Sequence, residues 1–218
     1  SILVANTLLL FGIALGRVWN TWMIVAGFIL CMAVTIIIGF PLFGANTGGT
    51  ITAVFAFTAM LLQATKSKAK VRNLAIAVAA VALVLGVFVA YDVMHGATTH
   101  MGKTTHLITA GGLSEIIMIA KRKLAINFMI LRYNTTWSYF LLITLGLLVL
   151  LWFRPVGLLQ RSLVNHRGIS AAISASIIGG ITGFAFNDSG ILIPAIIMSY
   201  MIPTVVYLML WEQGHSTE

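Results

Sequence analysis

Seven apolar runs that contain no Asp, Glu, Lys or Arg occupy most of this chain and restrict what it can fold into. They cover residues 1–16, 21–43, 50–65, 74–91, 136–153, 170–186 and 191–211. A transmembrane helix needs about 20 predominantly apolar residues. Long apolar runs without alternation of polar and apolar residues favour helices over barrel strands. The sequence therefore predicts an all-α, polytopic membrane helix bundle with about seven transmembrane helices, in a single transmembrane domain over residues 1–218.

The shortage of charged residues excludes several classes of protein. Only 8% of the residues are charged, whereas a soluble domain carries about 25%. The chain could not cover a surface that faces water on all sides, so it is not an ordinary cytosolic enzyme, a nucleic-acid-binding domain or a disordered tail. The net charge of +8 is therefore interpreted first as a signal of membrane orientation.

The basic residues give the orientation of the expected spans. Eight of the 13 lie in three connections, at Arg17, in residues 66–72 and in residues 154–167. With seven spans these connections share one side, which the positive-inside rule makes cytoplasmic. We therefore expect an N-terminus outside and a C-terminus in the cytoplasm.

The turn Asn187-Asp188-Ser189-Gly190 between the last two runs is the most distinctive motif. Its residue types favour a turn, and Asp188 or Ser189 could cap the next helix. Alternatively, the turn dips into the bilayer as a broken helix, with Asp188 lining a polar cavity and a cation such as Arg132 as its partner.

A second polar turn joins the second and third runs and contains Asn46, Gly48 and Gly49. Glycines at such a place let backbone N–H groups approach an anion. No lysine follows in the spacing of a nucleotide-binding loop. A flexible turn between helices is the alternative interpretation.

The long outer connection, residues 92–135, has two parts. The first contains Asp92, His95, His100 and His106, whose spacing matches no strong metal motif. These four are weak metal candidates, and we expect no metal.

The second part of this connection, residues 113–133, has the pattern of an amphipathic helix in the outer interface. It contains the triplet Lys121-Arg122-Lys123 and Asn127. The triplet either faces solvent and anionic head groups, or holds a phosphate-bearing ligand or an acidic partner domain.

Several short motifs together carry a resemblance to a known group of proteins. They are His100-Met101-Gly102-Lys103, Arg122-Lys123-Leu124 with Asn127, Trp137-Ser138, Arg154-Pro155, and Asn187-Asp188-Ser189-Gly190-Ile191 with Pro194. Over residues 90 to 210 the chain resembles the C-terminal multi-span region of poorly characterised bacterial membrane proteins, whose extracytoplasmic part is similar to the alkaline phosphatase superfamily. The resemblance implies a location in a bacterial cytoplasmic membrane and an extracytoplasmic domain before the spans. The 218 residues contain no such domain, so hydrolytic activity is not expected of this chain alone.

These features favour a membrane-embedded binding or scaffold module with an outward-facing polar site for an anionic lipid-linked ligand or a partner extracytoplasmic domain. The expected site residues are Asn46, Gly48, Gly49, Lys121, Arg122, Lys123, Asn127, Arg132, Asn187, Asp188, Ser189 and Gly190. The alternatives are a transporter or channel with a broken-helix site at Asn187-Asp188, and the membrane part of an enzyme that acts on lipid-linked phosphates.

No catalytic residue and no cofactor are predicted, because no Ser-His-Asp set, Cys-His set or pair of carboxylates has a plausible spacing. The expected partners are the lipid bilayer, an anionic lipid or lipid-linked phosphate, and an extracytoplasmic domain or another membrane subunit. Nucleic acid is not expected as a partner.

Overall fold

The computed structural model describes residues 1–65, 70–96, 114, 118, 121–133, 136, 138–140, 142, 143 and 157–215. Within these residues it contains helices and turns and no strand. The labelled helices are α1 (Ile2–Arg17), α2 (Thr21–Gly39), α3 (Thr47–Ala64), α4 (Lys70–Met94), α7 (Gly157–Asn165), α8 (Arg167–Phe186) and α9 (Leu192–His215). Residues 121–133 are also helical and are called segment 121–133 below.

Five of these helices are long and apolar enough to cross a membrane, namely α2, α3, α4, α8 and α9. The expectation of a helical chain with apolar membrane spans is therefore confirmed. Helix α1 is apolar but has only 16 residues, and most of the run 136–153 lies outside the described residues. The number of seven spans and their orientation remain predictions.

The ends of the helices differ from the expected ends by a few residues. Helix α2 stops at Gly39 rather than at residue 43, and Phe40 has an extended backbone (φ −64°, ψ 137°). The following Pro41 explains this, since proline disfavours the helical conformation of the residue before it. Helix α7 lies within residues 154–167, where the sequence predicted a connection between spans and no helix.

Helix α8 lies at the centre of the bundle and has its most extensive contacts with α3 and α1, followed by α9. Its buried residues are mostly small, and include Ala172, Ala175, Ser176 and Gly179. A Cβ atom on Gly179 would lie only 3.0 Å from the Cβ of Ala56 on α3. Small residues of this kind let helix backbones approach closely, as is common in membrane bundles.

Helices α8 and α1 cross closely, with Gly168 against Gly12. A Cβ atom on Gly12 would lie 2.8 Å from both the carbonyl oxygen of Gly168 and the Cβ of Ala172. The large residues of α1, such as Leu8 and Phe11, are fully buried in the same cluster. Helix α1 is therefore part of the core and not a peripheral arm.

The outer helices expose apolar side chains. On α4, Leu74, Leu83 and Val87 are all exposed, and little of this helix is buried. A soluble monomer rarely exposes a large contiguous apolar surface. This surface suits contact with lipid.

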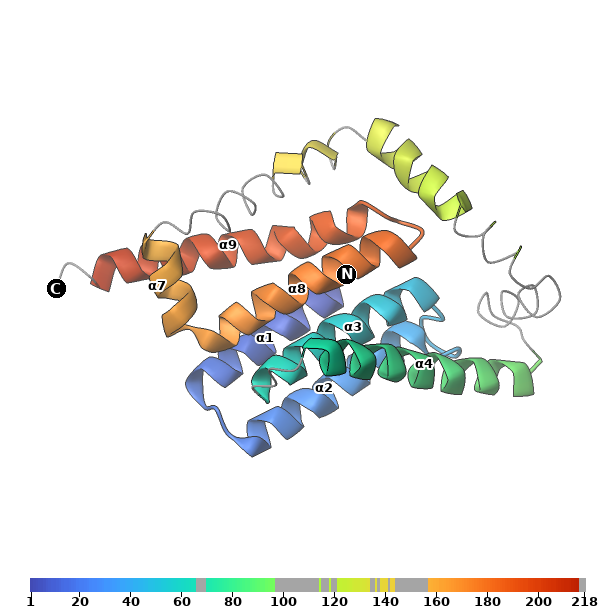
Figure 1. Ribbon diagram of the computed structural model, residues 1–218, viewed down its shortest axis with the longest axis horizontal. Helices are drawn as coiled ribbons and strands as arrows, with labels where there is room; N and C mark the ends of the chain where they lie inside the picture. Colours follow the sequence, from blue (N-terminus) through green and yellow to red (C-terminus); the bar gives the residue numbers. More distant parts are fainter. Residues whose placement is uncertain are drawn as a thin grey trace.

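The connections divide between the two ends of the bundle (Figure 1). The α2–α3 turn, the α8–α9 turn and the end of α4 lie at one end, which we call the polar end. The α1–α2 and α7–α8 connections and the end of α9 lie at the opposite end, which we call the basic end because Arg17, Arg161 and Arg167 lie there.

We predict that Gly168→Ala destabilises the protein by about 1–3 kcal/mol, because the new methyl group would collide with the backbone of α1. The control is Gly86→Ala on α4, where a Cβ atom meets nothing within 4 Å. That change should stabilise the helix by about 0.5–1 kcal/mol. Thermal unfolding in detergent can be followed by labelling Cys31, the one cysteine in the chain, which is buried. Equal effects of the two substitutions would contradict the close α1–α8 crossing.

Candidate functional site

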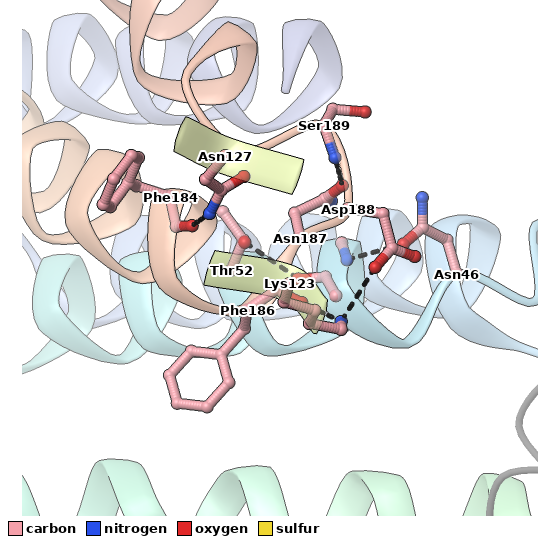
Figure 2. A network of polar contacts seen from close by, with 11 residues as sticks. Asn46, Thr52, Lys123, Asn127, Phe184, Phe186, Asn187, Asp188 and Ser189 are labelled. Carbon is pink, nitrogen blue, oxygen red and sulfur yellow. Dashed lines mark hydrogen bonds and ion pairs between the residues drawn. The ribbon is translucent and has the colours of Figure 1, made fainter. Parts of the chain in front are cut away.

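The polar end brings together three parts of the chain that are far apart in sequence. They are the start of α3, the turn between α8 and α9, and segment 121–133 (Figure 2). At the start of α3, a Cβ atom on Gly48 would lie 2.7 Å from the carbonyl oxygen of Phe186 and 2.8 Å from the Cα of Asn187. Gly48 therefore lets α3 begin directly against the last turn of α8.

Asn46 caps α3. Its side-chain oxygen accepts a hydrogen bond of 2.7 Å from the backbone N–H of Gly49, and its carbonyl oxygen accepts one of 2.8 Å from the hydroxyl of Thr50. Asparagine is among the best residues for this position. The Gly49 N–H, which the sequence suggested for an anion nest, is thus already bonded to the cap.

The turn between α8 and α9 has the chemistry that its residue types predict. The side-chain oxygen of Asn187 accepts a hydrogen bond of 3.1 Å from the N–H of Ser189, and its carbonyl oxygen accepts one of 3.1 Å from Gly190. Gly190 has a φ of +43°, a conformation that glycine adopts without strain. The turn joins two neighbouring helices, α8 and α9, and the Asp188 side chain is 76% exposed.

One face of segment 121–133 is buried or half-buried, along Lys123, Ile126, Asn127 and Ile130. Of these, Lys123, Asn127 and Ile130 contact the end of α8, the α8–α9 turn or the start of α9. The ammonium group of Lys123 donates a hydrogen bond of 2.6 Å to the carbonyl oxygen of Phe186. The amide of Asn127, which is only 4% exposed, donates one of 2.9 Å to the carbonyl oxygen of Phe184. Ile130 packs against Ile191 and Ala195.

The side chains of Lys123 and Asn127 donate hydrogen bonds to carbonyl groups at the end of α8. The last four carbonyl groups of a helix have no partner within it and carry a partial negative charge. An amide donor and an ammonium donor therefore suit this place. Lys123 and Asn127 act together as a cap that comes from a distant part of the chain.

Gly190 completes the fit of segment 121–133 to the turn. A Cβ atom at this position would collide with the side-chain oxygen of Asn127. That oxygen is buried and has no hydrogen-bond partner among the described residues. Gly190 is therefore required for the close approach of segment 121–133 as well as for the backbone conformation.

Asp188 forms an ion pair with Lys123, with 3.2 Å between the carboxylate oxygen and Nζ. The expected partner of Asp188 was Arg132, but the structure shows Lys123 in that position. The guanidinium group of Arg132 lies 5.6 Å from the centre of the Tyr133 ring. Lys121 and Arg122 are exposed at the start of the segment.

The expected site residues are thus arranged in two groups. The first group lies in or beside one network of contacts and comprises Asn46, Gly48, Gly49, Lys123, Asn127 and the turn 187–190. Lys121, Arg122 and Arg132 lie on the exposed side of segment 121–133.

The weak metal candidates do not form a site within the described residues. Asp92 is buried near the end of α4, and the Nδ1 atom of His95 lies 2.8 Å from the carbonyl oxygen of Tyr91. His100 and His106 fall outside the described residues. The described part of the chain contains no group of three or more His, Cys, Asp or Glu residues that could hold a metal ion.

Sequence reasoning missed what the backbone contributes to this site. The carbonyl groups of Phe184 and Phe186 hold Asn127 and Lys123 in place. The four-residue spacing of Lys123 and Asn127, which puts two donors on one helix face, was the available signal.

Comparison with protein-family models, with curated proteins and with solved structures finds no match to this chain.

Proposed function

We propose that this chain is a membrane-embedded binding module whose polar end holds an anionic lipid-linked ligand. The observation that carries the proposal is the anchoring of segment 121–133. Lys123 and Asn127 fix one face of the segment on the bundle. The adjacent cations Lys121 and Arg122 are exposed at the start of the same segment.

The exposed side of the segment suits a lipid-linked ligand in particular. Leu124, Phe128 and Met129 are exposed there beside the cations. A helix with exposed apolar and basic side chains binds at the boundary of head groups and acyl chains. Arginine and lysine are the usual partners of phosphate groups, through charge-assisted hydrogen bonds.

We also propose that the polar end faces the outside of a bacterial cytoplasmic membrane. The support is the gathering of Arg17, Arg161 and Arg167 at the opposite end of the bundle. Basic residues in short connections favour the cytoplasmic side.

The orientation can be tested with cysteine variants in a Cys31→Ser background. A membrane-impermeant maleimide added to whole cells should label Asp188→Cys, because this side chain is exposed at the polar end. Glu212→Cys, near the end of α9, should react only after the cells are lysed. The reverse pattern would contradict the orientation.

An extracytoplasmic domain that docks on the same end is the other form of this hypothesis. We favour the anionic lipid-linked ligand because the exposed cations lie beside exposed apolar side chains. The resemblance to membrane proteins with a phosphatase-like domain agrees with a phosphate-bearing ligand. Transport, or catalysis on lipid-linked phosphates, has no specific support in the geometry of the polar end.

The test of this function is a binding titration of the full chain in neutral detergent. A fluorophore on Ala125→Cys, in the Cys31→Ser background, would report binding at the exposed side of segment 121–133. Short-chain phosphatidic acid should bind more tightly than short-chain phosphatidylcholine. The double change Lys121→Gln with Arg122→Gln should weaken binding of phosphatidic acid about 30-fold, since each cation near a lipid surface contributes about 1 kcal/mol.

The matched control is Arg161→Gln with Arg167→Gln, which removes the same charge at the basic end. This pair should leave the titration unchanged. If both pairs of substitutions weakened the binding of phosphatidic acid equally, the affinity would depend only on the net charge of the protein, which would contradict a site at the polar end. Binding of the two lipids with equal affinity by the unaltered site would overturn the proposal.

A further inference from the structure

We propose that Asp188 is a built-in counter-ion that occupies a phosphate subsite on Lys123, and that the phosphate monoester group of a ligand displaces it. This inference rests on the proposed function, since it assigns the place where the ligand's phosphate binds. It changes the role of Asp188 from a residue that holds the ligand to one that competes with it.

Lys123 is held in place without Asp188. Its ammonium group donates the 2.6 Å hydrogen bond to the carbonyl oxygen of Phe186, and its side chain is only 24% exposed. The negative end of the α8 dipole favours a cation at this position. The ammonium has three donor hydrogens, so it can bond to Phe186 and to an anion at the same time.

Asp188, in contrast, can leave Lys123 without disturbing the turn. The hydrogen bonds of the turn are made by Asn187, Ser189 and Gly190 and do not use the Asp188 side chain. That side chain is largely exposed, and it points toward Lys123 (Figure 2). An ion pair with one largely exposed partner is weak, because water competes for the carboxylate.

A phosphate monoester is better suited to this position than a carboxylate. It carries a charge of about −1.5 to −2 and has three acceptor oxygens, whereas Asp188 offers a single negative charge. Lys121 and Arg122 lie in the same turn of helix as Lys123 but on its exposed side, so they add positive charge close to this position without sharing its face. A neutral or zwitterionic head group gains too little from Lys123 to displace the carboxylate, so the ion pair also selects for phosphate monoesters.

The experiment uses the same fluorophore on Ala125→Cys with three probes: short-chain phosphatidic acid, short-chain phosphatidylcholine and inorganic phosphate. Asp188→Asn should bind phosphatidic acid about two- to five-fold more tightly, the fold-change expected on loss of an exposed ion pair. Asp188→Glu keeps the carboxylate and should bind as the unaltered site does. Glu212→Gln makes the same change of net charge at the basic end and should have no effect.

The outcomes separate this inference from the proposed function. If Asp188→Asn binds phosphatidic acid equally or more weakly, while Lys121→Gln with Arg122→Gln still weakens binding, the counter-ion role is wrong and the binding function stands. If phosphatidic acid does not bind more tightly than phosphatidylcholine to any variant, the proposed function itself fails. If inorganic phosphate binds as tightly as phosphatidic acid and Asp188→Asn tightens both, the subsite is supported, but its ligand is free phosphate and not a lipid.

Discussion

The close packing of α8 against its neighbours depends on the small side chains along its buried faces. Gly168 meets Gly12 of α1, Gly179 meets Ala56 of α3, and Gly180 lies against Pro194 of α9. Lipid is as apolar as a leucine side chain, so helices in a membrane associate mainly through packing and hydrogen bonds. The glycines and alanines make that packing possible by letting backbones approach, and the other helices are arranged around α8.

The carbonyl groups at the end of α8 need hydrogen-bond donors, and side chains at the polar end supply them. The last carbonyl groups of this helix would have no partner in an apolar environment, where unsatisfied backbone groups are costly. Lys123 and Asn127 supply donors to two of them, from a segment about 60 residues earlier in the chain. The same hydrogen bonds fix the helical segment that carries Lys121 and Arg122. The candidate binding surface is therefore positioned by the contacts that cap α8.

Much of this architecture could be predicted from local sequence. The charge-free runs predicted apolar helices, and Asn46 and the turn 187–190 have the capping and turn chemistry of their residue types. Contacts between distant segments could not be predicted in this way. The partner of Asp188 is Lys123 and not Arg132 because Asn127 and Gly190 fix how segment 121–133 lies on the turn, which no local pattern reveals. Helix α7 was missed because it is short and contains polar residues.

The candidate binding surface exists only if segment 121–133 lies against the α8–α9 turn, as the ion pair between Lys123 and Asp188 indicates. This can be measured by cross-linking in native membranes with a short thiol-specific reagent, in a Cys31→Ser background. Lys123→Cys combined with Asp188→Cys should cross-link efficiently, whereas Lys123→Cys combined with Glu212→Cys should not, because Glu212 lies at the basic end. No cross-link in the first pair, or equal cross-linking in both, would contradict the arrangement of the polar end.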